Sequence, residues 1–193
     1  MNMNHNIFLI LILIILFYFV NKNEGFVLFK KSPINNKTYK VQEYENPKKA
    51  SILLSKLETN IDKLVKYLVN KYPNDERIIR LKNNLKYTDY EEAEHEENSS
   101  SYTINKGELI SVCLRQKNSD KSFHDLNMLM FVIIHELAHV MSLSIGHNKE
   151  FMINFKFLLH EAVEIDIYKP TNYEIDNVNY CGVDVTHNPY YDN

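Results

Sequence analysis

The sequence predicts an α+β domain with a small β-hairpin or sheet packed on a central helix, plus an N-terminal transmembrane helix. Three observations lead to this class. Apolar residues recur at helical spacing in long stretches, and residues 102–114 have the turn and the β-branched residues of a hairpin. Residues 7–20 are apolar without a break. At 193 residues, the chain is long enough for one domain with an additional segment.

The composition is that of an ordinary globular protein. Hydrophobic residues make up 45% of the chain, charged residues 24%, and the net charge is -3. Neither that charge nor the pI near 6.2 indicates a nucleic-acid partner. Cys113 and Cys181 are the only cysteines, so there is no disulfide framework, which fits a reducing compartment. A single bridge between them remains an open alternative.

The first 29 residues are predicted to be a hydrophobic membrane anchor. As a helix, the apolar run of residues 7–20 would be about 21 Å long, against roughly 30 Å for the hydrocarbon core of a bilayer. A cleaved signal peptide, which is the main alternative, would need a basic leader, and no Lys or Arg precedes the run. Lys22, Lys30 and Lys31 follow it, so the positive-inside tendency predicts a single-pass protein with its domain on the cytoplasmic side.

Residues 30–47 are predicted to be a linker, and residues 48–193 the folded domain. The linker is polar and contains Pro33 and Pro47. Leu and Ile side chains then repeat at helical spacing over residues 51–69, and a shorter helix is predicted over residues 75–85. The acidic and Ser-rich stretch that follows is predicted to be an exposed loop.

The predicted hairpin pairs residues 102–104 with residues 108–114. Asn105 and Gly107 supply its turn, and β-branched residues fill its strands. An edge strand at this place could bind an extended peptide through backbone hydrogen bonds, or it could merely cover the core.

The central helix carries the residues with the clearest chemical meaning. Its start is predicted near Ser122, where residues 122–125 have the form of a capping box. His135 and His139 lie one helical turn apart and could hold one metal ion, and Glu136 could act as general base on a water there. Buried histidines and a buried glutamate are costly unless they are paired or bound to metal, which favours a zinc site.

A catalytic zinc ion usually has three protein ligands. His147 follows His139 by eight residues, which is about 12 Å along an unbroken helix, so it can be the third ligand only if the helix ends first. Gly146 is the residue that would end it. The prediction is therefore one zinc ion per chain.

Glu161 and Glu164 are the alternative third ligands. Both lie on a helix predicted over residues 149–168, which Asn148 would cap. In the C-terminal tail, Tyr180 could stabilise an oxyanion, although packing is the commoner role for a tyrosine.

Residues 102–115, 129–139 and 146–151 together resemble the WLM-type and SprT-like (Spartan-like) zinc metallopeptidases. In those families a third His and a nearby Phe follow the two-His helix, and His147 and Phe151 match that pair. The resemblance implies a compact zincin-like α+β domain. It also implies zinc bound by His135, His139 and His147, with Glu136 as the catalytic base.

The predicted function is that of a zinc-dependent metalloendopeptidase, which hydrolyses peptide bonds with a zinc-activated water. Its substrate would be a protein or a peptide. Two alternatives stay open. One is a catalytically silent, membrane-tethered binding module with the same fold. The other, which only the family resemblance implies, is a protease that acts on DNA-crosslinked protein.

Overall fold

The computed structural model describes residues 10, 12, 27–94, 100–117 and 120–192. Within these residues the chain forms a five-stranded sheet, a two-stranded hairpin and four α-helices. The strands are β1 (Val27–Lys31), β2 (Thr38–Gln42), β3 (Asp89–Glu92), β4 (Tyr102–Ile104), β5 (Leu109–Val112), β6 (Val178–Tyr180) and β7 (Val183–Val185). The helices are α2 (Pro47–Lys71), α3 (Glu76–Asn84), α4 (Leu126–Met141) and α5 (Lys149–Glu164), with 3-10 turns η1 (Leu85–Tyr87) and η2 (Pro189–Tyr191). The predicted α+β class is confirmed.

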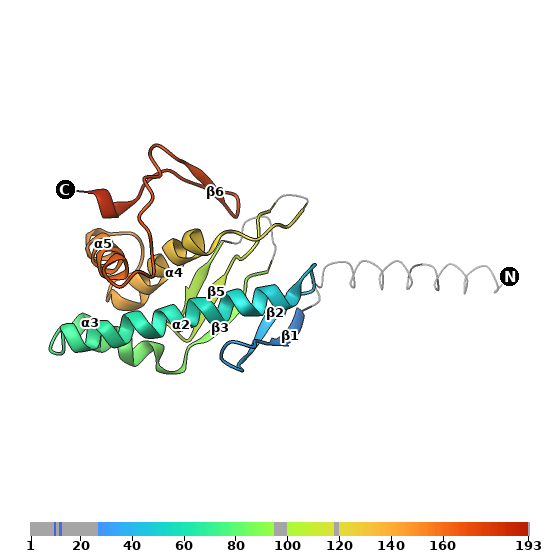
Figure 1. Cartoon of the computed structure of the whole chain (residues 1–193), viewed down its shortest axis with the longest axis horizontal. Helices are drawn as coiled ribbons and strands as arrows, with labels where there is room; N and C mark the ends of the chain where they lie inside the picture. The colour runs from blue at the N-terminus through green and yellow to red at the C-terminus, as the bar shows by residue number, and fades with distance from the viewer. Residues whose placement is uncertain (1–9, 11, 13–26, 95–99, 118–119, 193) are drawn as a thin grey trace.

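The strand order of the main sheet, β1-β2-β3-β5-β4, places β4 at an edge. The outer pairs β1–β2 and β4–β5 are antiparallel, whereas β3 is parallel to both β2 and β5. Figure 1 shows the long helix α2 crossing the sheet. α2 packs on β1, β2 and β3, and α4 contacts β4 and β5. The edge strand therefore lies beside the helix that carries the two-His motif.

Both amphipathic helices predicted before the hairpin are confirmed. α2 begins earlier than predicted, at Pro47, because proline is suited to the first helical turn, where its missing N–H is not needed. α3 begins after Asp75, whose side chain accepts a hydrogen bond from the Arg77 N–H. The predicted hairpin is also present, with Thr103 opposite Ile110.

The start of α4 differs from the prediction. Its N-cap is Asp125, which accepts a hydrogen bond from the Met128 N–H at 3.0 Å, and not Ser122. The Ser122 carbonyl accepts a hydrogen bond from the Gln116 N–H, and Phe123 forms a β-bridge with Arg115. These extended contacts hold the capping-box residues outside the helix.

A β-hairpin occupies the region predicted to be the end of the anchor and the linker. Leu28 pairs with Val41 in the β1–β2 ladder, so residues 27–31 are part of the sheet. Tyr39 and Val41 alternate with more exposed residues along β2 and are buried in the core. This alternation is the sequence signal of a half-buried strand, and it is short enough to be hidden by the polar residues around it.

In the part of the chain that the structure describes, no helix combines the length and the apolar character needed to cross a bilayer. α4 is nearly all apolar but has 16 residues, or about 24 Å, and α2 has 25 residues but several lysines. This finding contradicts the predicted transmembrane helix, the membrane partner and the single-pass localisation. Most of the predicted anchor, residues 1–9, 11 and 13–26, lies outside the described residues.

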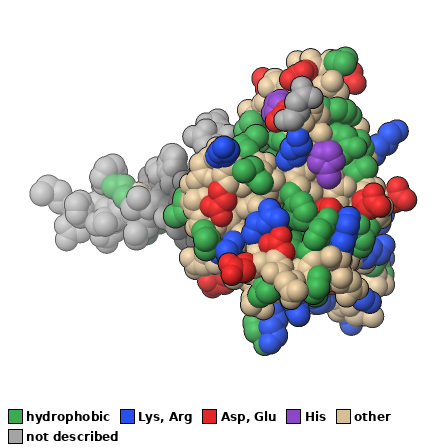
Figure 2. Space-filling model, turned by 90° about the vertical axis from the view of Figure 1, so that its left-hand side faces the viewer, with side chains coloured by type: hydrophobic (Ala, Val, Ile, Leu, Met, Phe, Trp, Pro, Cys, Tyr) green, Lys and Arg blue, Asp and Glu red, His purple; other side chains and the backbone are tan. Residues whose placement is uncertain are grey.

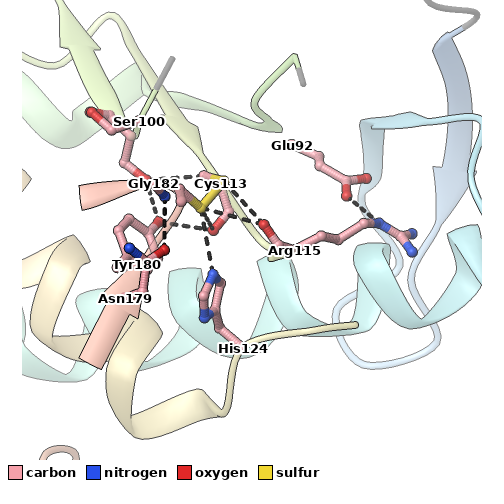
Figure 3. The surroundings of a disulfide bond; sticks show 10 residues. Glu92, Ser100, Cys113, Arg115, His124, Asn179, Tyr180 and Gly182 are labelled. Carbon is pink, nitrogen blue, oxygen red and sulfur yellow. Dashed lines mark hydrogen bonds and ion pairs between the residues drawn. A yellow bond between two sulfur atoms is a disulfide. The ribbon is translucent and has the colours of Figure 1, made fainter. Parts of the chain in front are cut away.

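The C-terminal segment is joined to the sheet by a disulfide between Cys113 and Cys181. Figure 3 shows this bond with Tyr180 and His124 beside it. The Tyr180 hydroxyl donates a hydrogen bond to the Cys113 carbonyl at 2.8 Å and pairs with the Ser101 hydroxyl at 2.6 Å. The single bridge that the sequence left open as an alternative is thus formed.

Candidate metal centre

Three histidine rings converge at the C-terminal end of α4. His135 and His139 come from successive turns of the helix, and His147 returns from the loop that follows it. The Nε2 atoms are 3.3 Å apart for His135 and His139, 3.1 Å for His139 and His147, and 3.0 Å for His135 and His147. The structure therefore brings together the three histidines that were predicted as ligands.

These distances fit a zinc ion. Three nitrogens that each lie about 2.05 Å from a tetrahedral zinc would be about 3.3 Å from one another. Burial lowers the pKa of His135 to about 3 and that of His139 to about 4, with further lowering from the neighbouring histidines in both cases. Both rings are therefore neutral near pH 7. Converging neutral imidazole nitrogens are the donor set that zinc prefers.

The rings rest on one aromatic side chain of α5. The Phe151 ring centroid lies 4.8 Å from that of His135, 4.3 Å from that of His139 and 4.7 Å from that of His147. Phe151 is almost fully buried, so it cannot move without opening the core. It holds all three rings by packing alone.

The loop between α4 and α5 makes the chain reversal that His147 needs. α4 ends at Met141, and α5 begins after Asn148, whose side chain accepts a hydrogen bond from the Phe151 N–H. Gly146 lies between them with φ of 84°, a backbone conformation that costs glycine little. The predicted end of the helix before His147 is confirmed, but the C-cap is Ser142 in an extended conformation. Gly146 lies four residues further on and is therefore not the helix cap that was predicted.

The alternative ligands lie elsewhere. The Glu161 carboxylate binds the Lys71 ammonium at 2.8 Å and the Tyr72 hydroxyl at 2.7 Å. Glu164 is exposed on α5. Among the described residues, the group of histidine, cysteine and acidic side chains able to hold a metal consists of the three histidines and includes neither glutamate.

Glu136 lies beside the histidines and is 5% exposed. Its Oε2 atom accepts a hydrogen bond from the Thr103 hydroxyl of β4 at 2.8 Å. Burial raises the pKa of this carboxyl to about 7, and the Thr103 hydrogen bond acts in the opposite direction. A carboxyl group with a pKa near neutrality is suited to accept and return a proton.

The histidines and Glu136 open into a cleft of about 670 Å³. Edge strand β4 forms one wall through Tyr102 and Thr103, and the loop after α4 contributes Ile145 and Gly146 to the lining. Tyr180 is not among the lining residues. Its buried hydroxyl is engaged by Ser101 and Cys113, which gives it a packing role here rather than that of an oxyanion donor.

Thr103 and Lys106 are two residues at this site that sequence reasoning did not identify. Thr103 was predicted as part of a strand, but strand alternation does not reveal which face of a hairpin meets the helix. Lys106 lies in the predicted turn, and its ammonium reaches the end of α4. A lysine next to glycine in a turn is a common surface pattern, so the sequence held no specific signal for it.

Comparisons with known proteins place the chain among related sequences. Residues 33–189 match the WLM domain. Protein R325 of Acanthamoeba polyphaga mimivirus is 35% identical over 180 residues, which cover 91% of this chain and 90% of that protein. Protein 136R of Invertebrate iridescent virus 6 is 38% identical over 87 residues, or 45% of this chain and 47% of that protein. Protein 042R of Invertebrate iridescent virus 3 is 40% identical over 87 residues, or 45% of this chain and 52% of that protein.

Among solved structures, the chain is similar to the crystal structure of Wss1 from Saccharomyces cerevisiae. That alignment has a TM-score of 0.48 and 23% sequence identity, and it covers 65% of this chain and 87% of Wss1. A mutant of Wss1 gives a TM-score of 0.47 and 21% identity.

Proposed function

This chain belongs to the WLM domain family, and from that premise we propose that it is a zinc-dependent metalloendopeptidase. Family membership supports a metalloprotease-type function and a protein substrate. The observation that carries the zinc mechanism is the convergence of three Nε2 atoms beside a buried carboxyl group.

His135, His139 and His147 would hold the zinc ion. When bound, zinc lowers the pKa of a coordinated water and polarises the scissile carbonyl group. Glu136 takes the proton from the water as the hydroxyl attacks, and it then delivers that proton to the leaving amine. The burial of Glu136 supports this role, because it raises the pKa of the carboxyl group to about 7.

Thr103 fixes the orientation of this base. Its hydroxyl donates to one carboxylate oxygen of Glu136, which restricts rotation of the carboxyl group within the cleft. Because Thr103 belongs to β4, this hydrogen bond connects the edge strand directly to the proposed base.

An extended peptide is the substrate shape that the cleft favours. β4 is an edge strand, so its outer backbone groups are available to pair with a substrate strand. Tyr102 on this strand and Ile145 on the loop after α4 both line the cleft, and they are 41% and 90% exposed. We therefore propose that apolar side chains of the substrate lie along this rim.

The charges on one face of the molecule give no indication of a requirement for nucleic acid. On the face shown in Figure 2, Lys and Arg side chains are interspersed with Asp and Glu side chains. The described residues on this face therefore provide no extended positive field for a phosphate backbone. Adding single- or double-stranded DNA to the peptidase assay is expected to leave the rate unchanged.

The decisive test is the substitution Glu136→Gln. The purified protein is expected to bind one zinc ion per chain before and after this change, because glutamine leaves the three ligands in place. Peptide hydrolysis is expected to fall by at least about 100-fold, since the base is lost. Metal analysis and cleavage of an unfolded protein such as casein provide the two measurements.

Two outcomes would contradict the proposal. A folded wild-type protein without zinc would exclude the metal site. A zinc-loaded wild-type protein that cleaves neither casein nor a peptide library would favour the silent binding module, which has the same fold and the same metal.

A further inference from the structure

The turn between β4 and β5 brings a lysine to the end of the metal-binding helix. Asn105 and Lys106 both have positive φ values, 47° and 58°, which are uncommon for residues other than glycine. Gly107 follows, and a Cβ atom there would lie 3.2 Å from the Asn84 carbonyl oxygen and 3.2 Å from Val140. The turn is thus packed closely against α4 and has little freedom to shift.

The Lys106 ammonium donates hydrogen bonds to three backbone carbonyl groups around the metal centre. The acceptors are His139 at 3.1 Å, Ser142 at 2.9 Å and Ser144 at 2.7 Å. The first belongs to the last turn of α4, and the other two belong to the loop that leads to His147. An ammonium group has three N–H donors, so this contact uses all of them.

A carboxylate holds the same loop from its other side. Glu150, in the first turn of α5, accepts hydrogen bonds from the N–H groups of Leu143 at 2.8 Å and Ser144 at 3.0 Å, and from the Ser144 hydroxyl. Lys106 therefore binds the loop carbonyls while Glu150 binds the loop amides. Without these partners, several backbone groups at the end of α4 would depend on water alone.

We propose that Lys106 is a positioning residue for the metal centre, which holds the loop of residues 142–147 so that His147 meets His135 and His139. The inference rests on the proposed zinc site. In this proposal the β4–β5 turn has two roles: it lines the cleft, and it supports the loop that carries His147. Lys106 contacts no ligand nitrogen. It acts through the backbone on both sides of the chain reversal.

The charge of Lys106 allows positioning to be distinguished from electrostatic repulsion, because the two predict opposite changes in zinc affinity. Two positive charges repel, so a purely electrostatic view predicts that removing this ammonium strengthens zinc binding. Positioning predicts the opposite sign, because zinc affinity falls when a ligand is no longer held in place.

The test is zinc affinity in Lys106→Met, measured by competition with a chromophoric chelator on the full chain. Methionine keeps the length and the apolar stem but has no donor. Affinity is expected to fall by about 10- to 100-fold, the range typical for loss of a residue that supports a metal ligand. Lys56→Met, at an exposed lysine on α2, is the matched control and is expected to have wild-type affinity.

A double-mutant cycle with His147→Ala separates positioning from general damage. If Lys106 acts through His147, then Lys106→Met weakens zinc binding by less than about two-fold in the His147→Ala protein, because the ligand it positions is already absent. An equal loss in both backgrounds would mean that the lysine supports the fold alone, and would overturn the proposal. Unchanged or tighter zinc binding in Lys106→Met would also overturn it.

Lys106→Arg is the second variant for the zinc-affinity measurement, to be used if Lys106→Met does not fold. Its planar fork retains the charge but matches three converging carbonyl groups less well than an ammonium does. An affinity between those of wild-type and His147→Ala is expected, and wild-type affinity in this variant would count against the need for the ammonium geometry. Zinc binding by the wild-type chain is measured first, so absence of the metal site is distinguished from failure of the lysine proposal.

Discussion

At the scale of single residues, the candidate site depends on side chains that reach across from a neighbouring element. Glu136 is held by Thr103 of the edge strand, and the three histidine rings rest on Phe151 of α5. These contacts restrict the rotamers of Glu136 and of the three histidines in the absence of substrate. Such preorganisation is worth more than the hydrogen bond alone, because catalysis depends on orientation within about 1 Å.

Thr103→Val tests this hydrogen bond at the base. Valine keeps the shape of threonine and removes the hydroxyl, so the fold and the zinc site are expected to remain. A hydrogen bond to a charged group contributes about 1.5–3 kcal/mol, which corresponds to a decrease in kcat of roughly 10- to 100-fold. KM for a peptide substrate is expected to change little, because the contact orients the base rather than the substrate.

Thr103→Ser is the matched variant, since it restores the hydroxyl. It is expected to retain most of the wild-type kcat. Equal kcat values for the valine and wild-type proteins, both with one zinc per chain, would show that Thr103 does not orient Glu136.

The convergence of the three histidines beside Glu136 was predictable from the sequence, whereas the residues that support them were not. His135 and His139 lie four residues apart on one helix, and Glu136 directly follows His135, so the periodicity of the helix determines their relative placement. His147 was predictable because Gly146 marks a chain reversal just before it. Thr103 and Lys106 reach the site only through the packing of a hairpin on α4, and nothing local in the sequence encodes that orientation.

At the scale of elements, the loop between α4 and α5 is stabilised by the carboxylate of Glu150. Hydrogen bonds from the Ser144 hydroxyl and from the N–H groups of Leu143 and Ser144 lower the pKa of Glu150 to about 2. The ordinary value, 4.5, applies to the unfolded chain. Between these two values the unfolded chain binds more protons than the folded one, so stability rises with pH.

The rise of stability with pH gives a prediction for Glu150→Gln. The stabilisation due to the carboxylate is fully present above about pH 4.5 and disappears as the pH falls toward about 2. The difference in unfolding free energy between wild-type and Glu150→Gln is therefore expected to shrink across this window. Urea unfolding of metal-free protein at several pH values measures it, and EDTA removes the separate effect of zinc release.

Glu164→Gln is the control for this experiment, because Glu164 is exposed at the other end of the same helix. A difference between wild-type and Glu150→Gln that stays constant from pH 5 to pH 2.5 would show that the carboxylate does not hold the loop.

The helices were easier to predict than the strands. α2, α3 and α5 each carry a repeating apolar face, which a window of ten or more residues reveals. β1 and β2 have five residues each, and their pairing brings together residues that the sequence separates by Pro33 and two asparagines. A five-residue strand gives a weak signal, and its partner is determined only by the folded sheet.

At the scale of the whole molecule, the C-terminal segment contacts both the sheet and the helices. The β6–β7 hairpin is joined through Cys181 to Cys113, directly after β5, and η2 packs against α5. In Figure 1 this segment lies over the same side of the molecule as α4 and α5. Such long-range closure was not predictable, because two distant cysteines are compatible with either a bridge or two free thiols.

The bridge is expected to contribute strongly to stability but not to metal binding. Its cysteines are separated by 68 residues in the sequence, and closing a loop of that size in the unfolded chain costs about 4 kcal/mol in the chain-entropy account. Removal of a native disulfide typically costs about 2–5 kcal/mol, so Cys113→Ala with Cys181→Ala is expected to lower the free energy of unfolding by about this amount. TCEP is expected to lower the stability of the wild-type protein similarly and to leave the double variant unchanged.

Zinc stoichiometry is expected to remain one per chain, because the proposed ligands come from α4 and the loop after it. Equal urea midpoints for the wild-type protein with and without TCEP would mean that the two cysteines are not joined.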